Sequence, residues 1–119
     1  MRGVSLPGRQ RLRRRSARGP ARSRAGARWS RRAGQAAQAL RNTATGLAGA
    51  GATFRDVVRL TFYVTHWEPE KIDAFMAGVE SVAAELDLPT PMPPASLIGV
   101  EYLFMPDVLV EVEATAVLD

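Results

Sequence analysis

Cysteine is absent from this chain of 119 residues, and histidine occurs once, as His66. Without cysteine, neither a disulfide framework nor thiolate metal ligation is available. A single histidine excludes a metal site built from several histidines and disfavours a Ser-His-Asp triad within one chain. The sequence also lacks a run of about 18 apolar residues, the length that a membrane-spanning helix needs. We therefore predict a protein without a metal site and without a membrane span.

Acidic residues are absent from the first 41 positions, whereas arginine is abundant there. This segment holds 13 of the 16 basic residues, all of them arginine. Residues 42–119 hold all 12 acidic residues against Arg55, Arg59 and Lys71. The net charge of +4 therefore averages a basic N-terminal segment and an acidic remainder, which we expect to be separate parts of the protein.

Residues 1–32 consist almost wholly of Arg, Ala, Gly, Ser and Pro, without a helical or strand period. Such a composition buries too little apolar surface to offset chain entropy, so we predict a disordered tail. Three interpretations of this tail stay open. It resembles a mitochondrial-type transit peptide, it could neutralise phosphates on nucleic acid, or it is the product of a misplaced start or frameshift in GC-rich DNA. The absence of lysine favours the last interpretation.

Apolar side chains at helical spacing predict two helices, over residues 35–50 and 69–86. Gly49 and Gly51 supply the end of the first helix, one of them in the left-handed conformation. Four prolines within residues 87–94 end the second. The stripe of the second helix contains Ile72, Phe75, Met76, Val79, Val82 and Leu86.

Alternating apolar residues predict a strand over residues 56–65 and two more near the C-terminus, over 95–103 and 108–117. In the first strand, Val58, Leu60, Phe62 and Val64 share one face. We interpret residues 93–118 as a hairpin with its turn at 104–107. Gly99 inside its first strand indicates a bulge or a close backbone approach.

Glu111 and Glu113 are the one constellation that could carry chemistry. Two residues apart on a strand, they point to the same face, with Cα atoms about 6.5–7 Å apart. In a covered site they could position a water or an ammonium group. On an exposed face they would be solubilising charges, and the spacing alone favours this second interpretation. His66 stands in a loop after a strand, where an ordinary surface role is the commoner one.

From Gln38 onward the chain resembles the Rid family of YjgF-type proteins, once also called L-PSP endoribonucleases. The matching pieces are QALRNTATGLAGAGATFRDVVRLTFYVT, the proline connector, PASLIGVEYL and LVEVEATAV. The resemblance implies an α+β, chorismate-mutase-like mixed sheet with two helices on one face. It also implies a cytoplasmic homotrimer with small-molecule clefts between subunits. We accordingly expect a RidA-like domain over residues 33–119.

The resemblance also indicates a reaction. Active Rid deaminases hydrolyse 2-imino or enamine acids to 2-keto acids and ammonia without a cofactor. A signature arginine holds the substrate carboxylate, and a glutamate of the last strand helps to place the attacking water. Glu111 stands at the position of that glutamate, but Ala95 stands where the arginine would be. Ser96 and the backbone of Ala95 and Leu97 are the expected substrate contacts.

The region before the first helix departs from the family pattern. The family has an N-terminal hairpin and a further strand that ends in a Ser-Gly-Gln-like turn. Here residues 33–35 read Ala-Gly-Gln and run straight into the predicted helix, after the arginine-rich tail. We therefore expect an N-terminally incomplete sheet with an exposed edge.

Three functions follow, in order of preference. The first is a trimeric small-molecule-binding protein without deaminase activity, whose acidic Glu111/Glu113 face and uncharged Ala95 favour a neutral or cationic ligand. The second is a cofactor-free imine or enamine hydrolase in which Glu111 places water. The third, least favoured, is a nucleic-acid-associated protein that acts through its arginines.

Overall fold

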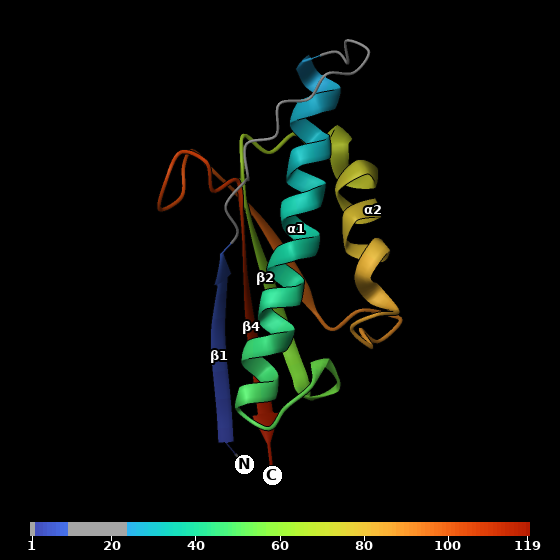
Figure 1. Ribbon diagram of the computed structural model, residues 1–119, viewed down its shortest axis with the longest axis vertical. Helices are drawn as coiled ribbons and strands as arrows, with labels where there is room; N and C mark the ends of the chain where they lie inside the picture. Colours follow the sequence, from blue (N-terminus) through green and yellow to red (C-terminus); the bar gives the residue numbers. More distant parts are fainter. Residues whose placement is uncertain (1, 10–23) are drawn as a thin grey trace.

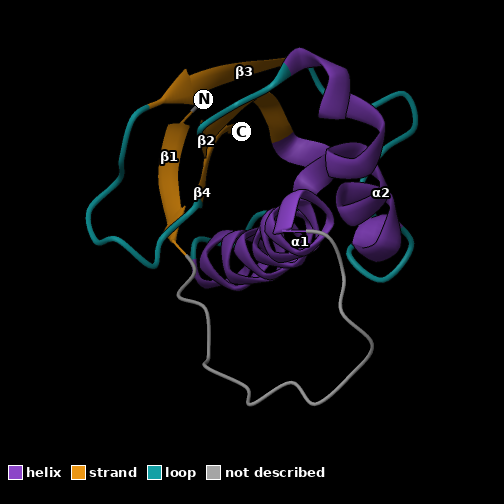
Figure 2. Ribbon diagram, turned by 90° about the horizontal axis from the view of Figure 1, so that it is seen from above, coloured by secondary structure: helices purple, strands orange, loops and turns teal. Residues whose placement is uncertain are grey.

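The computed structural model describes residues 2–9 and 24–119, which form one four-stranded sheet with two helices on one of its faces (Figures 1 and 2). The elements in chain order are β1 (Arg2–Arg9), α1 (Arg24–Gly49), β2 (Val57–Thr65), α2 (Ile72–Ala83), β3 (Ala95–Val100) and β4 (Val110–Leu118). Short 3-10 turns at Phe54–Asp56 and Pro69–Lys71 precede β2 and α2. The predicted α+β architecture, a mixed sheet with two helices on one face, is confirmed.

The strand order is β1-β4-β2-β3, so β2 lies between the two C-terminal strands. β3 pairs with β2 in parallel, and β4 pairs with β2 antiparallel from the other side. The predicted hairpin at residues 93–118 is therefore wrong, because β3 and β4 are not neighbours in the sheet. The alternation of apolar and polar residues indicates that a segment is an extended strand, but it does not indicate which other strand the segment pairs with. Residues 101–109 are a crossing loop from one side of β2 to the other.

β2 matches its predicted range closely, but its first residues are out of phase with the prediction. A register irregularity between Val57 and Arg59 leaves Val58 without a partner in β4. Val57 therefore enters the core, whereas the side chain of Val58 is 49% exposed. A β-bulge of this kind inserts one residue and shifts the side-chain alternation. Leu60, Phe62 and Val64 face the core as predicted.

The core lies between the sheet and the helix pair. One row of side chains at the last strand faces this core, because Val108, Val110, Val112, Ala114 and Ala116 are all buried. Edge-to-face aromatic contacts join the layers, with ring centroids 5.6 Å apart for Phe62 and Phe75 and 5.7 Å apart for Trp67 and Phe75. Trp67 also packs against β3, since a Cβ on Gly99 would lie 3.0 Å from the Trp67 Cβ. The close approach at Gly99 is therefore made by a side chain and not, as predicted, by another backbone.

α1 is longer than predicted, because it begins at Arg24 rather than near Gln35. Its first turns contribute Trp29, which is 3% exposed and lies edge-to-face with Trp67 at a centroid distance of 5.6 Å. Burial of this side chain stabilises a segment whose composition alone indicated disorder. The helix ends as expected, with Gly51 in the left-handed conformation at φ 77°.

The N-terminal segment differs from the predicted disordered tail in two places. Arg2–Arg9 forms β1, which pairs antiparallel with β4, and residues 24–32 belong to α1. Backbone groups of β4 offer hydrogen-bond partners regardless of side-chain type, so an arginine-rich sequence can extend the sheet. β1 also occupies the side of β4 that an N-terminally incomplete sheet was expected to leave open. Residues 10–23 lie outside the described residues, and the three interpretations of the tail stay predictions.

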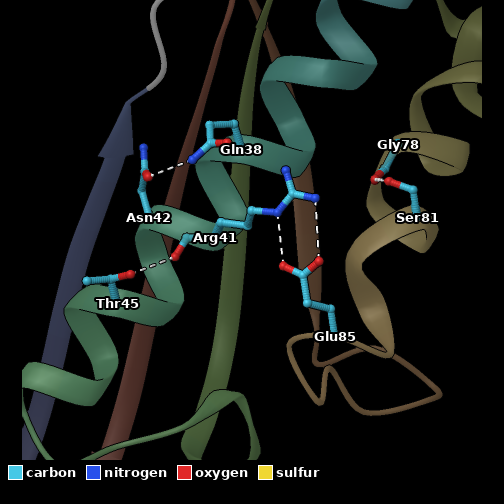
Figure 3. Close-up of polar contacts among 7 residues, drawn as sticks. All are labelled: Gln38, Arg41, Asn42, Thr45, Gly78, Ser81 and Glu85. Carbon is cyan, nitrogen blue, oxygen red and sulfur yellow. Dashed lines mark hydrogen bonds and ion pairs between the residues drawn. The ribbon is translucent and has the colours of Figure 1, made fainter.

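α2 is shorter than predicted: it begins after a 3-10 turn and ends at Ala83. It crosses α1 closely at Gly78, where a Cβ would lie 2.8 Å from the Cα and carbonyl carbon of Ala33 and nearer still to its oxygen. Further along the helices, the Arg41 guanidinium pairs with the Glu85 carboxylate at 2.9 Å (Figure 3). Since both side chains are about half exposed, this ion pair adds little to the stability of the helix pair.

Candidate binding face of the sheet

The side of the sheet away from the helices, which we call the open face, carries most of its polar side chains. Strand pairing aligns these side chains in rows. One row runs Ser96–Thr61–Glu113 across β3, β2 and β4. The next runs Ile98–Tyr63–Glu111. Neighbouring strands lie about 4.8 Å apart, so each row places its accessible side chains near one another, although Thr61 in the middle of the first row is 7% exposed.

The structure divides the four site residues that the sequence suggested between the two faces of the sheet. Glu111 and Ser96 lie on the open face, in adjacent rows. Ala95 and Leu97 alternate with Ser96 and pair with Leu60 and Phe62, so they belong to the face that the helices cover. Leu97 is partly buried against the core. Any side-chain contact of a ligand on the open face therefore involves Ser96 rather than its neighbours.

Arg59 supplies a cation to the open face that the sequence analysis did not assign to the site. Its Nη2 donates a hydrogen bond to the Ser96 Oγ at 2.5 Å. Both groups are accessible, since Arg59 is exposed and Ser96 is partly exposed. Alternation along β2 already put Arg59 on this face. What the sequence did not contain was the parallel pairing that brings β3, and with it Ser96, next to Arg59.

Two buried polar side chains of α1 hold the end of the sheet near the loop at residues 101–109. The Gln35 amide is 2% exposed and donates to the Asp107 carbonyl at 2.9 Å. Its Oε1 accepts from the backbone N–H of Leu109 at 2.8 Å and of Val110 at 3.3 Å. Gln35 thus satisfies backbone groups at the start of β4 that would otherwise be buried without partners. Its place inside α1 differs from the turn that residues 33–35 had suggested.

Arg32 performs the corresponding role at the end of β2. Its side chain is 3% exposed, and its Nε donates to the Thr65 carbonyl at 2.8 Å. Its Nη2 donates to the Thr65 Oγ1 at 3.1 Å, and its guanidinium carbon lies 5.3 Å from the centre of the Trp29 ring. From the sequence alone, Arg32 was predicted to belong to the disordered tail. A buried arginine anchored in this way is part of the folded domain.

A cavity of about 410 Å³ lies where the crossing loop meets the ends of β2 and β4. Its lining consists of Thr65, His66, Glu101, Tyr102, Leu103, Phe104, Met105, Pro106, Val108 and Leu109. Thr65 and Leu109 continue the alternation of Tyr63 and Glu111, which places the cavity at the end of the open face. His66, at φ 51°, is held by a hydrogen bond from its N–H to the Val100 carbonyl at 3.2 Å.

One ion pair shifts pKa values in the described part of the chain, and it lies outside the open face. A hydrogen bond from the Arg55 guanidinium to the Asp87 carboxylate, 2.8 Å from Nε to Oδ2, holds the pKa of Asp87 below its usual value. The pKa of Arg55 is raised by the same hydrogen bond. The pair joins the turn before β2 to the segment after α2, which is a structural role.

The open face can recognise both signs of charge. A guanidinium beside a hydroxyl binds a carboxylate through charge-assisted hydrogen bonds. A glutamate binds an ammonium group or accepts a proton from water. Within residues 2–9 and 24–119, no group of three His, Asp or Glu side chains could hold a metal ion. In the same residues, no helix is long and apolar enough to cross a membrane.

Comparison with known proteins gives a consistent result. The family model described as Endoribonuclease L-PSP matches residues 19–118. This match begins upstream of residue 33, where the sequence analysis had placed the start of the domain. A search of curated proteins finds no match.

Several solved structures are similar to this chain. YyfB of Yersinia pestis, a protein of unknown function from the conserved Rid family, is 30% identical, with a TM-score of 0.68 over 99% of this chain and 80% of that one. Rv2704 of Mycobacterium tuberculosis, from the YjgF/YER057c/UK114 family, is 32% identical, with a TM-score of 0.57 over 72% and 67% of the two chains. E. coli TdcF, solved with bound serine, is 25% identical, with a TM-score of 0.59 over 71% and 63%.

Proposed function

The chain belongs to the Rid family of YjgF-type, endoribonuclease L-PSP proteins, and we propose from this premise that it binds an amino-acid-like small molecule on the open face. Family membership supports a RidA-like small-molecule-binding protein. The ligand class is our inference from the charges that the rows of the open face bring together.

The observation that carries the proposal is the hydrogen bond from Arg59 to Ser96, with Glu113 in the same row as Ser96. Arg59 and Ser96 can bind a carboxylate on one side of Thr61, and Glu113 can bind an ammonium group on its other side. An α-amino acid carries both groups on one carbon. The sequence alone had favoured a neutral or cationic ligand, because of the acidic Glu111/Glu113 face and the uncharged Ala95. The bound serine of TdcF is consistent with a zwitterion in a related protein.

The proposal includes a homotrimer in which a neighbouring subunit completes the site. Each polar row is open on the side away from the helices, so a ligand there contacts protein on one side alone. Ile98 on this face is 44% exposed in the single chain, and a neighbouring subunit would cover it. Size-exclusion chromatography with light scattering tests this part: a mass near three times 12.9 kDa is expected, and a monomer at all concentrations would contradict it.

The binding proposal is tested by calorimetry with three related probes. L-serine has both charged groups, ethanolamine lacks the carboxylate, and 3-hydroxypropanoate lacks the ammonium group. We expect L-serine to bind most tightly, because loss of a charge-assisted hydrogen bond costs about 1.5–3 kcal/mol, or roughly ten- to a hundredfold in Kd. Arg59→Ala should weaken L-serine binding to the level of ethanolamine binding.

Arg41→Ala is the matched control, since Arg41 is a partly exposed arginine on α1 that pairs with Glu85. It should leave L-serine binding unchanged. Equal effects of the two substitutions, or equal affinities for all three probes, would contradict an amino-acid site on the open face.

A second function, hydrolysis of a 2-imino or enamine acid, is favoured by the same arginine. Arg59 places a cation next to Ser96, although Ala95 lacks the signature charge. In this reaction water adds to the imine carbon, its proton passes through the Glu111 carboxylate to the nitrogen, and ammonia leaves as the carbonyl forms. An ammonia-release assay with an imino-acid generator tests it. Release that Glu111→Gln abolishes would support the hydrolase, whereas release that survives this substitution would exclude Glu111 as its proton carrier.

The nucleic-acid function that the arginine-rich tail suggested depends mainly on residues 10–23, which lie outside the described residues. It stays a prediction. Deletion of the tail should remove nucleic-acid binding and its salt dependence if this prediction is right.

A further inference from the structure

The cavity at the crossing loop has features that the amino-acid site does not use. Its volume of about 410 Å³ lies within the range of small-molecule pockets in proteins. It is set apart from the Arg59–Ser96 pair: Thr65 and Leu109 lie beyond Tyr63 and Glu111 along their strands. Thr65 on the cavity floor lies four residues beyond Thr61 along β2. The cavity floor is therefore about 13–14 Å from the Ser96–Thr61–Glu113 row. A serine-sized ligand cannot occupy both places.

The floor of the cavity is fixed by hydrogen bonds. Thr65 donates its backbone N–H to the Leu109 carbonyl at 3.0 Å and is held from the other side by Arg32. Gln35 holds the backbone of Leu109. The loop above the floor is closed by the Val108 N–H, which donates to the Met105 carbonyl at 3.0 Å. A floor fixed in this way is formed before a ligand arrives, which reduces the entropy cost of binding.

The rim of the cavity is aromatic and unusually exposed. Tyr102 is 77% exposed and Phe104 is 71% exposed, which makes them the two most exposed large apolar residues of the described chain. Aromatic rings at the mouth of a cavity offer a ligand a large apolar contact area. Met105, which also lines the cavity, has a flexible thioether side chain that adapts to different ligand shapes.

The charge of the cavity favours a cation. Among the described residues that line it, Glu101 is the one carboxylate, and none is a lysine or arginine. The faces of Tyr102 and Phe104 carry the negative part of the ring quadrupole, which attracts organic cations. A carboxylate ligand would meet none of these attractions.

We propose that this cavity is a second binding site, for a small organic cation with an aromatic or alkyl body. The apolar body lies on Val108 and Leu109, and the ammonium group lies between the Glu101 carboxylate and the aromatic rim. This proposal does not depend on amino-acid binding at Arg59 and Ser96, since it uses different residues.

Calorimetry with three probes of one shape tests the charge preference. Phenethylamine carries a cation, 2-phenylethanol is neutral and 3-phenylpropanoate carries an anion on nearly the same body. We expect phenethylamine to bind at least about fivefold more tightly than 2-phenylethanol, because a cation gains both the ion pair and the ring attraction. 3-Phenylpropanoate should bind most weakly. An equal or tighter Kd for 3-phenylpropanoate would overturn the proposal.

Substitutions locate the cation. Glu101→Gln keeps the size of the side chain and removes its charge, so it should bring phenethylamine close to 2-phenylethanol in affinity. Tyr102→Leu combined with Phe104→Leu keeps apolar area while removing the rings, and it should weaken phenethylamine more than 2-phenylethanol. Glu80→Gln is the matched control, because Glu80 is an exposed glutamate of α2. It should change none of the three affinities.

Methyl NMR shifts during the phenethylamine titration give the position directly. We expect the largest shifts at Thr65, Val108 and Leu109. Two results would place the cation on the polar rows of the open face and so overturn the proposal. The first is a set of methyl shifts centred on Thr61. The second is a preference for phenethylamine that is lost in Glu111→Gln and kept in Glu101→Gln. Failure of L-serine to bind would leave these results unchanged, so the two proposals fail separately.

Discussion

The two faces of β2 and β4 are made by alternate residues of the same strands, yet they differ in almost every property. On the helix side, Phe62 and Val112 are buried in an apolar core. On the other side, Tyr63 and Glu111 are partly exposed and lie in polar rows. A residue on the covered face is constrained by packing, whereas one on the open face is free to serve a ligand or a partner subunit. We therefore expect substitutions on the two faces to separate stability from binding.

Phe62→Ala and Tyr63→Ala form the sharpest pair, because the residues are adjacent in β2. Phe62→Ala removes a ring that is 2% exposed and packs against Phe75. It should lower the free energy of unfolding by about 3–5 kcal/mol. Tyr63→Ala should cost clearly less, since its side chain is partly exposed in the single chain. Chemical denaturation measures both. Equal losses would show that the open face is packed as tightly as the covered one.

Gly78→Ala should have the next largest effect, because it forces α1 and α2 apart. The added methyl group would meet the Ala33 backbone, which cannot rotate away as a side chain can. We expect a loss of about 1–3 kcal/mol, the usual range for overpacking. Gly34→Ala is the control, since a Cβ there meets nothing within 4 Å. It should be neutral or stabilise α1 by up to about 1 kcal/mol, through the higher helix propensity of alanine. A stable Gly78→Ala protein would contradict the helix crossing.

Gln35→Ala tests whether α1, which packs on the covered face, holds the loop at residues 101–109 in place. It leaves the N–H of Leu109 and the carbonyl of Asp107 without their partner, at a cost of about 1–3 kcal/mol. Hydrogen exchange at Leu109 and Val110 should also become faster. Gln38→Ala serves as the comparison, because Gln38 bonds to the exposed Asn42 side chain (Figure 3). An equal loss of stability in the two variants would show that Gln35 does not anchor the loop.

From residue 35 onward, the sequence predicted the presence of the helices and strands well and the pairing of the strands poorly, whereas it missed β1 and the first turns of α1. Leu60, Phe62 and Val64 were assigned to the core from alternation alone, since burial on one face determines that pattern. Val58 was misplaced because a bulge has no signature in a run of apolar residues. The hairpin was wrong because pairing depends on residues far apart in the chain. The same limit hid the contact of Arg59 with Ser96, whose residues are separated by α2 and the proline segment.

The smallest expected effect is a pH dependence at the Arg55–Asp87 pair. The pKa of Asp87 is lowered from its usual 3.8 by the hydrogen bond from Arg55. A lowered folded-state pKa stabilises the protein above the unfolded value, and this contribution is lost as the pH falls from about 3.8 through the folded value. Asp87→Asn should therefore lower Tm slightly at pH 7 and not at pH 2. Asparagine tolerates the positive φ of 53° at this position, so the backbone is kept. A larger difference at pH 2 would contradict the sign.

The measurement that tests the central claim most directly is a methyl NMR titration with L-serine. Ile98 and Thr61 carry methyl groups on the open side of the sheet, where Ile98 is 44% and Thr61 7% exposed, whereas Val64 and Val112 carry them in the core. If the open face is the binding face, the methyl signals of Thr61 and Ile98 should shift with saturation, and those of Val64 and Val112 should stay nearly constant. Shifts confined to Val64 and Val112, or no shift at millimolar L-serine, would contradict the assignment of the binding site to the open face.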